Sequence, residues 1–580
     1  MGSPSDEKKM IRETLLGTSN PRGGFQTLPF IIANEAFERM ASIGLLPNMI
    51  LYLTREYGME TARGINILFI WSAVTNFMPL IGAFLADSYV GRFHMISFGS
   101  IASLLGMFLL WFTTNFPPAR FPHCDELSKN CISPTTAQLL LLYSSFGFMS
   151  FGAGGIRSSS LAFGADQLQS RGGNPNSEGI LRSYFGWYYG AVSISAIIAL
   201  TCIVYIQDRL GWQVGFGVPC MLMLLSAALF FLASPFYVKL KANKSLLTGF
   251  AQVIVASYRN RHIELSSQAT NENYHYKKGA EFVKPTETLR FLNRACIIRN
   301  PQQDLSPDGR ASEDPWSICT IDQVEELKSL IKVIPLWSSG IMLCVTLGQS
   351  SIAVLEASTM DRHITPTFQI PAGSFSFFMI FTLTIWITLY DRIIIPLASK
   401  IVGKPTFLSS KQRMGTGLIL SSASIASLAI IETIRRKKAI KEGFSDNPHG
   451  VVKMSAMWLL AYHILSGLAE AFNIVGQIEF YYSELPKSMS SVASSLAGAG
   501  MSAASLVSSF ILNIVDDSTK RGGKESWVSS NINRGHYDWY FSVLVGLSLL
   551  NFVYFLSCCK AYGPLKEKGL RCALRSRGLQ

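Results

Sequence analysis

Three charged side chains lie together in an apolar stretch near the start of the chain: Glu35, Glu38 and Arg39. Charges in a membrane-length segment are costly unless they pair with one another or line a wet cavity. At positions i, i+3 and i+4 the three side chains fall on one face of a helix. A carboxylate that can bind a proton, next to a guanidinium that is always charged, is suited to proton coupling. We therefore take Glu35, Glu38 and Arg39 as the candidate proton-coupling residues.

Two further ionisable residues lie deep in predicted membrane helices, one in each half of the chain: Arg157 and Glu470. At 1.5 Å of rise per residue, each lies about 28 Å from the outer end of its helix. A base and an acid at matched depth in opposite halves predict a salt bridge that closes the inner side. The alternative is a static ion pair that only fixes helix packing, although burying such a pair without purpose is costly.

The helices that would carry these residues follow from composition. Hydrophobic residues make up 49% of the 580 residues and charged residues only 15%, whereas soluble domains carry about 25% charged residues. The prediction is an all-α membrane protein whose spans can each cross about 30 Å of hydrocarbon. We predict twelve spans, at roughly 28–53, 64–86, 93–113, 138–164, 183–205, 213–238, 331–355, 373–398, 412–434, 452–480, 489–514 and 538–559.

The distribution of positive charge orients these spans. Loops on the side of the N-terminus carry about twice as many Lys and Arg residues as the opposite loops, which marks the cytosolic face and places both termini there. One predicted outer loop breaks the trend, because it contains Arg435, Arg436, Lys437 and Lys438. The net charge of +13 is therefore assigned to an anionic membrane surface and not to nucleic acid.

The predicted organisation has five parts: a cytosolic tail (1–27), a six-helix bundle (28–238), a cytosolic central loop (239–330), a second six-helix bundle (331–559) and a cytosolic tail (560–580). Two such halves are the plan of major facilitator carriers, whose substrate site lies between the halves. Within the loop, residues 245–258 have amphipathic spacing suited to a membrane surface. Thr320 and Gln323 fit a capping box that starts the next helix.

Other motifs have structural interpretations. Asp87 and Arg92, at an inner helix end, are expected to pair and to form a hinge. The small residues at 152–155 favour close helix packing. Cys124 and Cys131 share one outer loop, where a disulfide and two free thiols both stay open. The Cys and His spacings predict no zinc site.

Taken together, these motifs resemble the plant nitrate/peptide transporter family, the plant branch of the proton-coupled oligopeptide transporters. The resemblance rests on motifs spread over nearly the whole chain: Glu35-x-x-Glu38-Arg39, Gly82…Asp87…Gly91-Arg92, Gly154-Gly155-Ile156-Arg157, Phe163-Gly164-Ala165-Asp166-Gln167 and Glu470-Ala471-Phe472…Gly476-Gln477-x-Glu479-Phe480. It implies proton coupling by the first cluster and an inner gate formed by Arg157 and Glu470.

The chain also departs from this family. Ser158 stands where many members have Pro, and His94-Met95 where some have a phosphorylatable Thr. Leu347 stands where some nitrate carriers place a substrate-facing His, so a histidine contact to nitrate is not available. Arg39, Leu347 and Trp337 are the candidate substrate-binding residues.

The predicted function is proton-coupled symport of a small anionic solute by alternating access, with nitrate slightly ahead of an organic solute such as a glycoside, hormone or small peptide. A nutrient sensor that signals through the central loop is the alternative from another class. The sequence predicts no enzyme activity, cofactor, metal or nucleic-acid partner. The expected partners are the solute, protons, the lipid bilayer and a kinase acting on cytosolic segments, and the plasma membrane is preferred to the vacuolar membrane. Direction, affinity and oligomeric state stay open.

Overall fold

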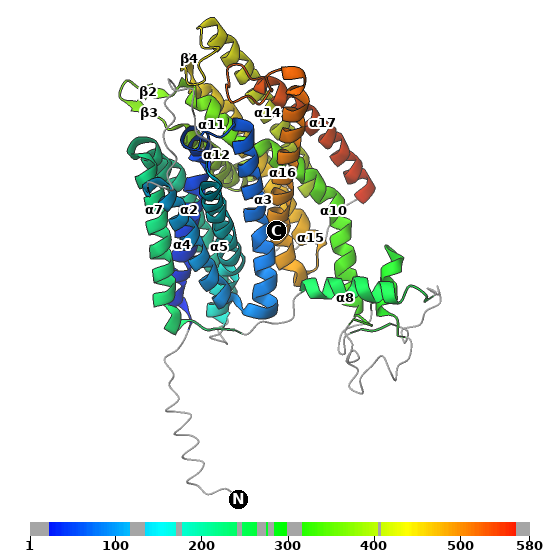
Figure 1. Cartoon of the computed structure of the whole chain (residues 1–580). Helices are drawn as coiled ribbons and strands as arrows, with labels where there is room; N and C mark the ends of the chain where they lie inside the picture. The colour runs from blue at the N-terminus through cyan, green and yellow to red at the C-terminus, as the bar shows by residue number, and fades with distance from the viewer. Residues whose placement is uncertain are drawn as a thin grey trace, which may run out of the picture. The chain divides into compact units, whose positions relative to one another are not determined.

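The structure is a computed structural model that describes residues 23–116, 134–169, 177–240, 246–263, 274–276, 283–298, 316–403 and 408–563. The chain divides into two compact units (Figure 1). Unit 1 comprises Met1–Met49, Glu56–Gly58 and Met78–Ala242, and unit 2 comprises Ile50–Arg55, Met59–Phe77 and Asn243–Gln580. Cys124 and Cys131 lie outside the described residues.

Unit 1 contains almost all of five long helices and only the end of a sixth, α3. They are α2 (Leu28–Leu51), the second part of α3 (Thr61–Leu85), α4 (Arg92–Asn115), α5 (Thr136–Gln169), α6 (Ser177–Ile198) and α7 (Val204–Leu232). π-Helical turns at Tyr52–Glu56, Ala86–Val90 and Ala199–Ile203 and 3₁₀ turns at Phe25–Thr27 and Ser234–Phe236 extend or flank these helices. Gly211, with φ of 80°, bends α7 sharply, a conformation that glycine adopts without strain.

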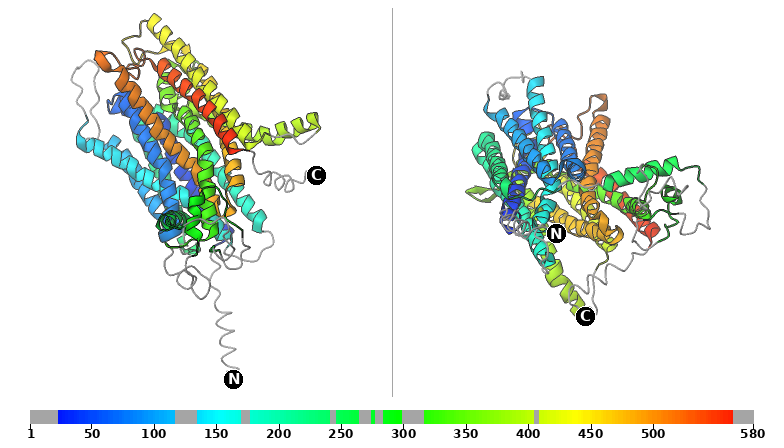
Figure 2. Two further views of the ribbon diagram at one scale, coloured as in Figure 1. Left: turned by 90° about the vertical axis from the view of Figure 1, so that its right-hand side faces the viewer. Right: turned by 90° about the horizontal axis from the view of Figure 1, so that it is seen from below.

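Unit 2 contains the first part of α3 and the helices that follow unit 1. They are α8 (Leu246–Arg259), α10 (Ile321–Leu347), α11 (Ser350–Ser358), α12 (Ser376–Leu389), α13 (Ile395–Val402), α14 (Ser410–Lys441), α15 (Leu460–Glu484), α16 (Ser490–Thr519) and α17 (Tyr537–Tyr562). A π-helical turn (Tyr390–Ile394) and 3₁₀ turns (Arg290–Cys296, Ala372–Phe375, Ala456–Leu459, Lys487–Met489 and Arg521–Gly523) complete the helical part. α14 and α17 pack along each other (Figure 2, left).

Two small sheets, which were not predicted, lie in unit 2. β1 (Met360–Asp361) pairs in parallel with β4 (Val452–Ser455), and β2 (His363–Thr365) pairs in antiparallel with β3 (Phe368–Gln369). Through β1 and β4, the segment that follows α11 is tied to the segment that precedes α15.

Helices lie at all the predicted spans. Among the described residues, ten segments are long and apolar enough to cross a membrane, and one of them, Gly179–Leu232, covers two predicted spans. The helix of the first predicted span, α2, carries Glu35, Glu38 and Arg39. The all-α membrane class is confirmed, whereas the count of twelve, the side of the termini and the five predicted boundaries stay predictions.

The prediction that Arg435–Lys438 lie in an outer loop is wrong. α14 continues to Lys441, so these four residues are helical, and the Arg435 side chain is fully buried. The cause is local: Arg435 pairs with Glu432 one turn earlier, and this pairing allows a charge inside the helix bundle where hydropathy alone predicts a boundary.

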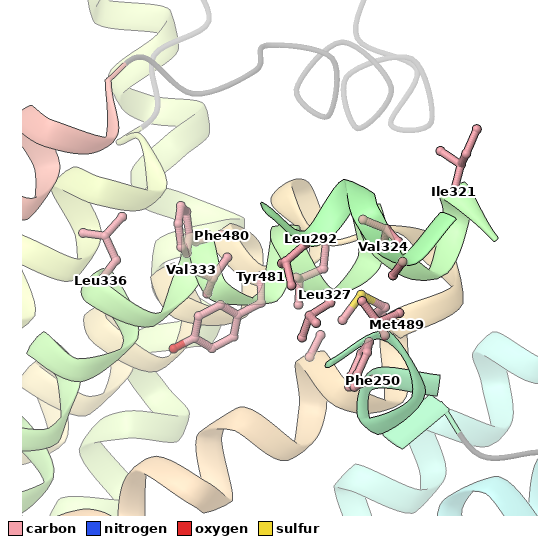
Figure 3. Close-up of a cluster of buried hydrophobic side chains, with 14 of the residues drawn as sticks. Phe250, Leu292, Ile321, Val324, Leu327, Val333, Leu336, Phe480, Tyr481 and Met489 are labelled. Carbon is pink, nitrogen blue, oxygen red and sulfur yellow. The ribbon is translucent and has the colours of Figure 1, made fainter. Parts of the chain in front are cut away.

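Parts of the central loop pack against helices of unit 2, to which they belong (Figure 3). The cluster joins Phe250 of α8 and Leu292 of the 3₁₀ turn to Val324 and Leu327 of α10 and to Met489. The predicted amphipathic helix is present as α8, and its apolar face contributes to this core. The Thr320–Gln323 capping box is confirmed at the start of α10. In Figure 1, α8 lies across the start of α10.

Candidate functional site

The first ion pair of unit 1 lies within α2. Arg39 Nε donates to Glu35 Oε1 at 2.9 Å, one helical turn apart. The Glu35 side chain is 1% exposed and that of Arg39 is 29% exposed. Tyr188 of α6 lies close enough to interact electrostatically with both partners. The pair therefore joins a fully buried acid to a base whose side chain is only partly buried.

The second ion pair joins α2 to α5. Arg157 Nη2 donates to Glu38 Oε1 at 2.9 Å, and its Nε donates to Glu38 Oε2 at 3.2 Å. Ser42 Oγ adds a third hydrogen bond to Glu38, at 2.6 Å. Glu38 is completely buried, and the Arg157 side chain is 13% exposed. Two-point pairing of a guanidinium with a carboxylate is among the strongest charged contacts in proteins.

These two pairs revise the predicted cluster. Its three members lie on one helix as expected, but the two carboxylates have different bases, and Arg157 is the fourth member. The group of two acids and two bases has no net charge when all four side chains are ionised. Such neutrality is needed because an unpaired buried charge is costly. Arg157 had been assigned to Glu470, which belongs to unit 2. The Arg157–Glu470 gate therefore stays a prediction, and the Glu38–Arg157 pair is the contact that sequence spacing missed.

Small residues place Arg157 opposite Glu38. A Cβ atom at Gly152 would lie 2.0 Å from Ser103 Oγ of α4, and one at Gly155 would lie 2.6 Å from the Met95 carbonyl oxygen. α5 therefore contacts α4 backbone to backbone along the turn before Arg157. The prediction of close packing at 152–155 is confirmed, and this packing holds the part of α5 before Arg157 directly against α4.

Asp87, in the π-helical turn after α3, and Arg92, the first residue of α4, form a three-residue network with Asp166 near the end of α5. Arg92 Nη2 lies 3.2 Å from Asp87 Oδ1, and Arg92 Nη1 donates at 2.8 Å to both carboxylate oxygens of Asp166. Asp166 was part of a quoted motif but was not assigned a partner. The sequence could have indicated this contact, because Asp166 is an acid without an expected partner near the end of the helix that carries Arg157.

In unit 2, Glu470 lies on α15 with its Oε2 atom buried and without a hydrogen-bond partner among the described residues. One turn further, Asn473, Gln477 and Tyr481 form a hydrogen-bonded row on the same helix. Gln477 Nε2 donates to Asn473 Oδ1 at 2.6 Å, and the Tyr481 hydroxyl donates to Gln477 Oε1 at 3.1 Å. The Oε2 atom of Glu470, the acid assigned to the gate, thus lies outside this hydrogen-bonded row and has no partner among the described residues.

The two other candidate substrate residues lie on α10. Trp337 is half-buried, and its Nε1 donates to the Leu496 carbonyl oxygen of α16 at 2.8 Å. Leu347 is the last residue of α10 and is partly buried against the core. The Trp337 indole N–H is therefore used in helix packing, and the substrate roles of Trp337 and Leu347 stay predictions.

Sequence reasoning also missed a buried charged group in unit 2: Glu356 on α11 and Glu432 and Arg435 on α14. All three side chains are completely buried. Glu432 and Arg435, three residues apart, were a recognisable i, i+3 pair, but the predicted end of the span separated them. Among the described residues, no group of three His, Cys, Asp or Glu side chains is placed to hold a metal ion.

Known proteins resemble the chain in sequence and in fold. The PTR2 model of the POT family matches residues 93–528. Protein NRT1/PTR FAMILY 1.2 of Arabidopsis thaliana is 53% identical, over 98% of this chain and 94% of that protein. Protein NRT1/PTR FAMILY 1.1 of the same plant is 50% identical, over 98% and 97%.

The solved structures agree with this assignment at the level of the fold. An auto-inhibited POT family peptide transporter matches with a TM-score of 0.68 and 18% identity, over 94% of this chain and 98% of that chain. The POT family transporter PepTSo matches with a TM-score of 0.65 and 15% identity, over 93% and 98%. The chain therefore belongs to the POT family of membrane transporters, within its plant NRT1/PTR branch.

Proposed function

We propose that this protein is a proton-coupled symporter of a small anionic solute, with nitrate as the leading candidate. The observation that carries the proposal is the pairing of the buried Glu38 carboxylate with Arg157 through two hydrogen bonds. The proton would bind at Glu38, and the anion would take the place of the lost negative charge.

The coupling follows from charge balance. When Glu38 takes up a proton, Arg157 keeps its positive charge and loses its counter-charge, which is costly in a buried setting. An anion that approaches the guanidinium restores neutrality, so that proton and anion favour each other's binding. Arg39, whose side chain is 29% exposed, offers a second guanidinium for the anion when Glu35 is protonated.

The proposed inner gate uses the same base. Once released from Glu38, Arg157 is available for Glu470, whose buried Oε2 has no partner among the described residues. An exchange of Arg157 between the two carboxylates would couple proton binding to the alternation of the two halves. Such an exchange moves the equilibrium only by the difference in stability of the two paired states.

The chemistry of guanidinium favours a planar oxoanion as the solute. Its rigid fork of N–H donors matches two oxygens of a planar anion, and no histidine is needed for that contact. An organic solute is the second candidate. It is favoured by the fold neighbours solved with 5-aminolevulinic acid and with a thioalcohol-conjugated peptide, and by the exposed aromatic ring of Trp187.

Uptake of isotope-labelled nitrate and membrane currents, measured in oocytes at acidic and neutral pH, test the proposal. We expect acid-stimulated uptake that Glu38→Gln lowers at least about tenfold, equivalent to about 1.4 kcal/mol. Glu60→Gln, which changes an exposed carboxylate, is the matched control. Nitrate uptake that ignores both pH and Glu38→Gln would rule out the proton role, whereas acid-stimulated uptake of only organic solutes would select the second candidate.

A sensor that signals through the central loop is separated from a carrier by the same assay. Uptake by a variant with a shortened loop at 299–315 should persist in a carrier. If the variant with the shortened loop kept its uptake but lost signalling, the loop would have a signalling role that is separate from transport.

A further inference from the structure

We propose that Glu356 holds a second exchangeable proton, in unit 2 and away from the Glu38 site. This inference rests on the proposed proton-coupled function and assigns it a further residue. Glu356 lies on the short helix α11, and its side chain is completely buried. Neither of its carboxyl oxygens has a hydrogen-bond partner among the described residues.

The nearby base cannot satisfy Glu356, because all its donors are in use. A guanidinium has five N–H donors. Arg435 donates Nε and one Nη2 hydrogen to the two oxygens of Glu432, at 2.6 and 2.8 Å. Its remaining donors contact the Thr359 hydroxyl at 3.1 Å, the Asn533 amide oxygen at 2.8 Å and the Ile532 carbonyl oxygen at 3.2 Å. No donor is left for the second carboxyl group.

The charges of the group lead to the same result. Glu356 and Glu432 would carry two negative charges against the single positive charge of Arg435, with all three side chains completely buried. Arg436 and Asp538 also interact with Glu432, but their opposite charges cancel in this count. An uncompensated buried charge is avoided by taking up a proton. Because Glu432 is held by two charged hydrogen bonds and Glu356 by none, the proton belongs on Glu356.

The other groups that face Glu356 do not supply a charge. Tyr462 of α15 and Tyr537 of α17 interact electrostatically with it. Their hydroxyl groups donate elsewhere, Tyr462 to the Thr346 carbonyl oxygen at 3.4 Å and Tyr537 to the Ser529 carbonyl oxygen at 2.8 Å. Glu356 is thus surrounded by one paired acid, one saturated base and two neutral phenols.

The local fold gives Glu356 a route to exchange. α10 ends at Leu347 and α11 begins at Ser350, so two residues of turn separate the helices. Thr359, which receives one Arg435 donor, lies one turn after Glu356 and is bonded to its backbone carbonyl. Movement of α11 would therefore shift Glu356 and Thr359 together relative to Arg435. In the exchange step the Glu356 O–H bond breaks, the proton passes to water, and Arg435 donors transfer from Thr359 and Asn533 to the new carboxylate.

Infrared spectroscopy of the purified full-length protein tests the protonation without relying on transport. We expect a carboxylic acid C=O stretching band at neutral pH that Glu356→Gln removes and the control Glu60→Gln retains. If Glu356→Gln does not fold, Glu356→Asp keeps a carboxyl group and should move the band. A band that is absent in the wild-type protein, or unchanged in these variants, would overturn the assignment.

The number of protons moved per solute tests the exchange. From reversal potentials in reconstituted vesicles, we expect Glu356→Gln to lower the proton-to-solute ratio by one while solute uptake continues. An unchanged ratio, or uptake by the wild-type protein that requires sodium, would overturn the role in coupling. Failure of the Glu38 proposal is seen separately, because the infrared band of Glu356 does not depend on Glu38→Gln.

Discussion

The two buried charge groups of this transporter are built on opposite principles. In unit 1, two acids face two bases, each carboxylate has its own guanidinium, and the Arg39 and Arg157 side chains are 29% and 13% exposed. In unit 2, two acids share one base, and all three side chains are completely buried. The first group is neutral when fully ionised, whereas the second reaches neutrality only by binding a proton.

This difference separates two kinds of proton site. In the proposed mechanism, the balanced and partly exposed group of unit 1 exchanges a proton for an anion, which binds the base that is released. A dry group with excess acid holds its proton until a neighbouring helix moves. The two groups thus differ in their balance of acids and bases and in the exposure of their arginine side chains. We expect the first to couple protons to the solute and the second to couple protons to helix movement. The following variants test this comparison.

The largest expected effect is on the stability of unit 2. Arg435→Met leaves Glu432 buried without its base, and breaking a buried pair costs about 3–5 kcal/mol. We expect a large fall in the thermal unfolding temperature of the purified protein, measured by fluorescence-detected size exclusion. Arg435→Lys should restore little, because an ammonium has three donors where five are used. Lys437→Met, at an exposed neighbouring position, is the control, and equal stability of the Arg435→Met and Lys437→Met variants would contradict the comparison.

The next effect concerns the helix contact that places Arg157. Gly152→Ala puts a methyl group 2.5 Å from the Ser103 backbone nitrogen, and overpacking of this kind costs about 1–3 kcal/mol. We expect a lower unfolding temperature and lower uptake. Gly147→Ala is the matched control on the same helix, because nothing lies within 4 Å of its added methyl group. Because alanine favours a helix more than glycine does, Gly147→Ala should be neutral or slightly stabilising, and an equal loss of stability in both variants would contradict the close-packing explanation.

A smaller effect is expected for the geometry of the Glu38–Arg157 pair. Arg157→Lys keeps the charge but replaces the two-point contact by a single ammonium. We expect uptake at acidic pH to fall about tenfold, which corresponds to about 1.4 kcal/mol, with little change in stability. Arg63→Lys, at an exposed position, is the control. Wild-type uptake by Arg157→Lys would mean that only the charge of Arg157 matters.

The smallest effect on stability is expected for an exposed ion pair, which serves as a reference for the buried pairs. Lys520 Nζ lies 3.3 Å from Glu60 Oε1, and both side chains are more than half exposed. Lys520→Met should change the free energy of unfolding by no more than about 0.2–1 kcal/mol.

The pH dependence of this exposed pair has a definite sign. The hydrogen bond and charge of Glu60 raise the pKa of Lys520. The small stabilisation is therefore present below the ordinary lysine pKa, about 10.4, and is lost as pH rises through the raised value. Unfolding measured from neutral to strongly alkaline pH should show the Lys520→Met difference only on the neutral side.

Much of the site was predictable because local spacing and composition decide it. Apolar segment lengths located the helices, and the i, i+4 spacing of Glu35 and Arg39 gave a pair that forms within one helix. The small residues before Arg157 predicted close packing, and Thr320 with Gln323 predicted a helix start. Each of these features depends on residues that are near one another in the chain.

The chain by itself determined which segments are membrane helices, which family it belongs to and which residues carry charge among apolar neighbours. Only the tertiary structure decided the partners of those charges: Arg157 with Glu38, Arg92 with Asp166, and Arg435 saturated while Glu356 is left without a donor. The physical reason is that a buried charge must be neutralised by whichever group the packed helices bring within hydrogen-bond distance. The hydropathy pattern shows where a charge lies among apolar residues, whereas the packing of the helices determines which residue pairs with it.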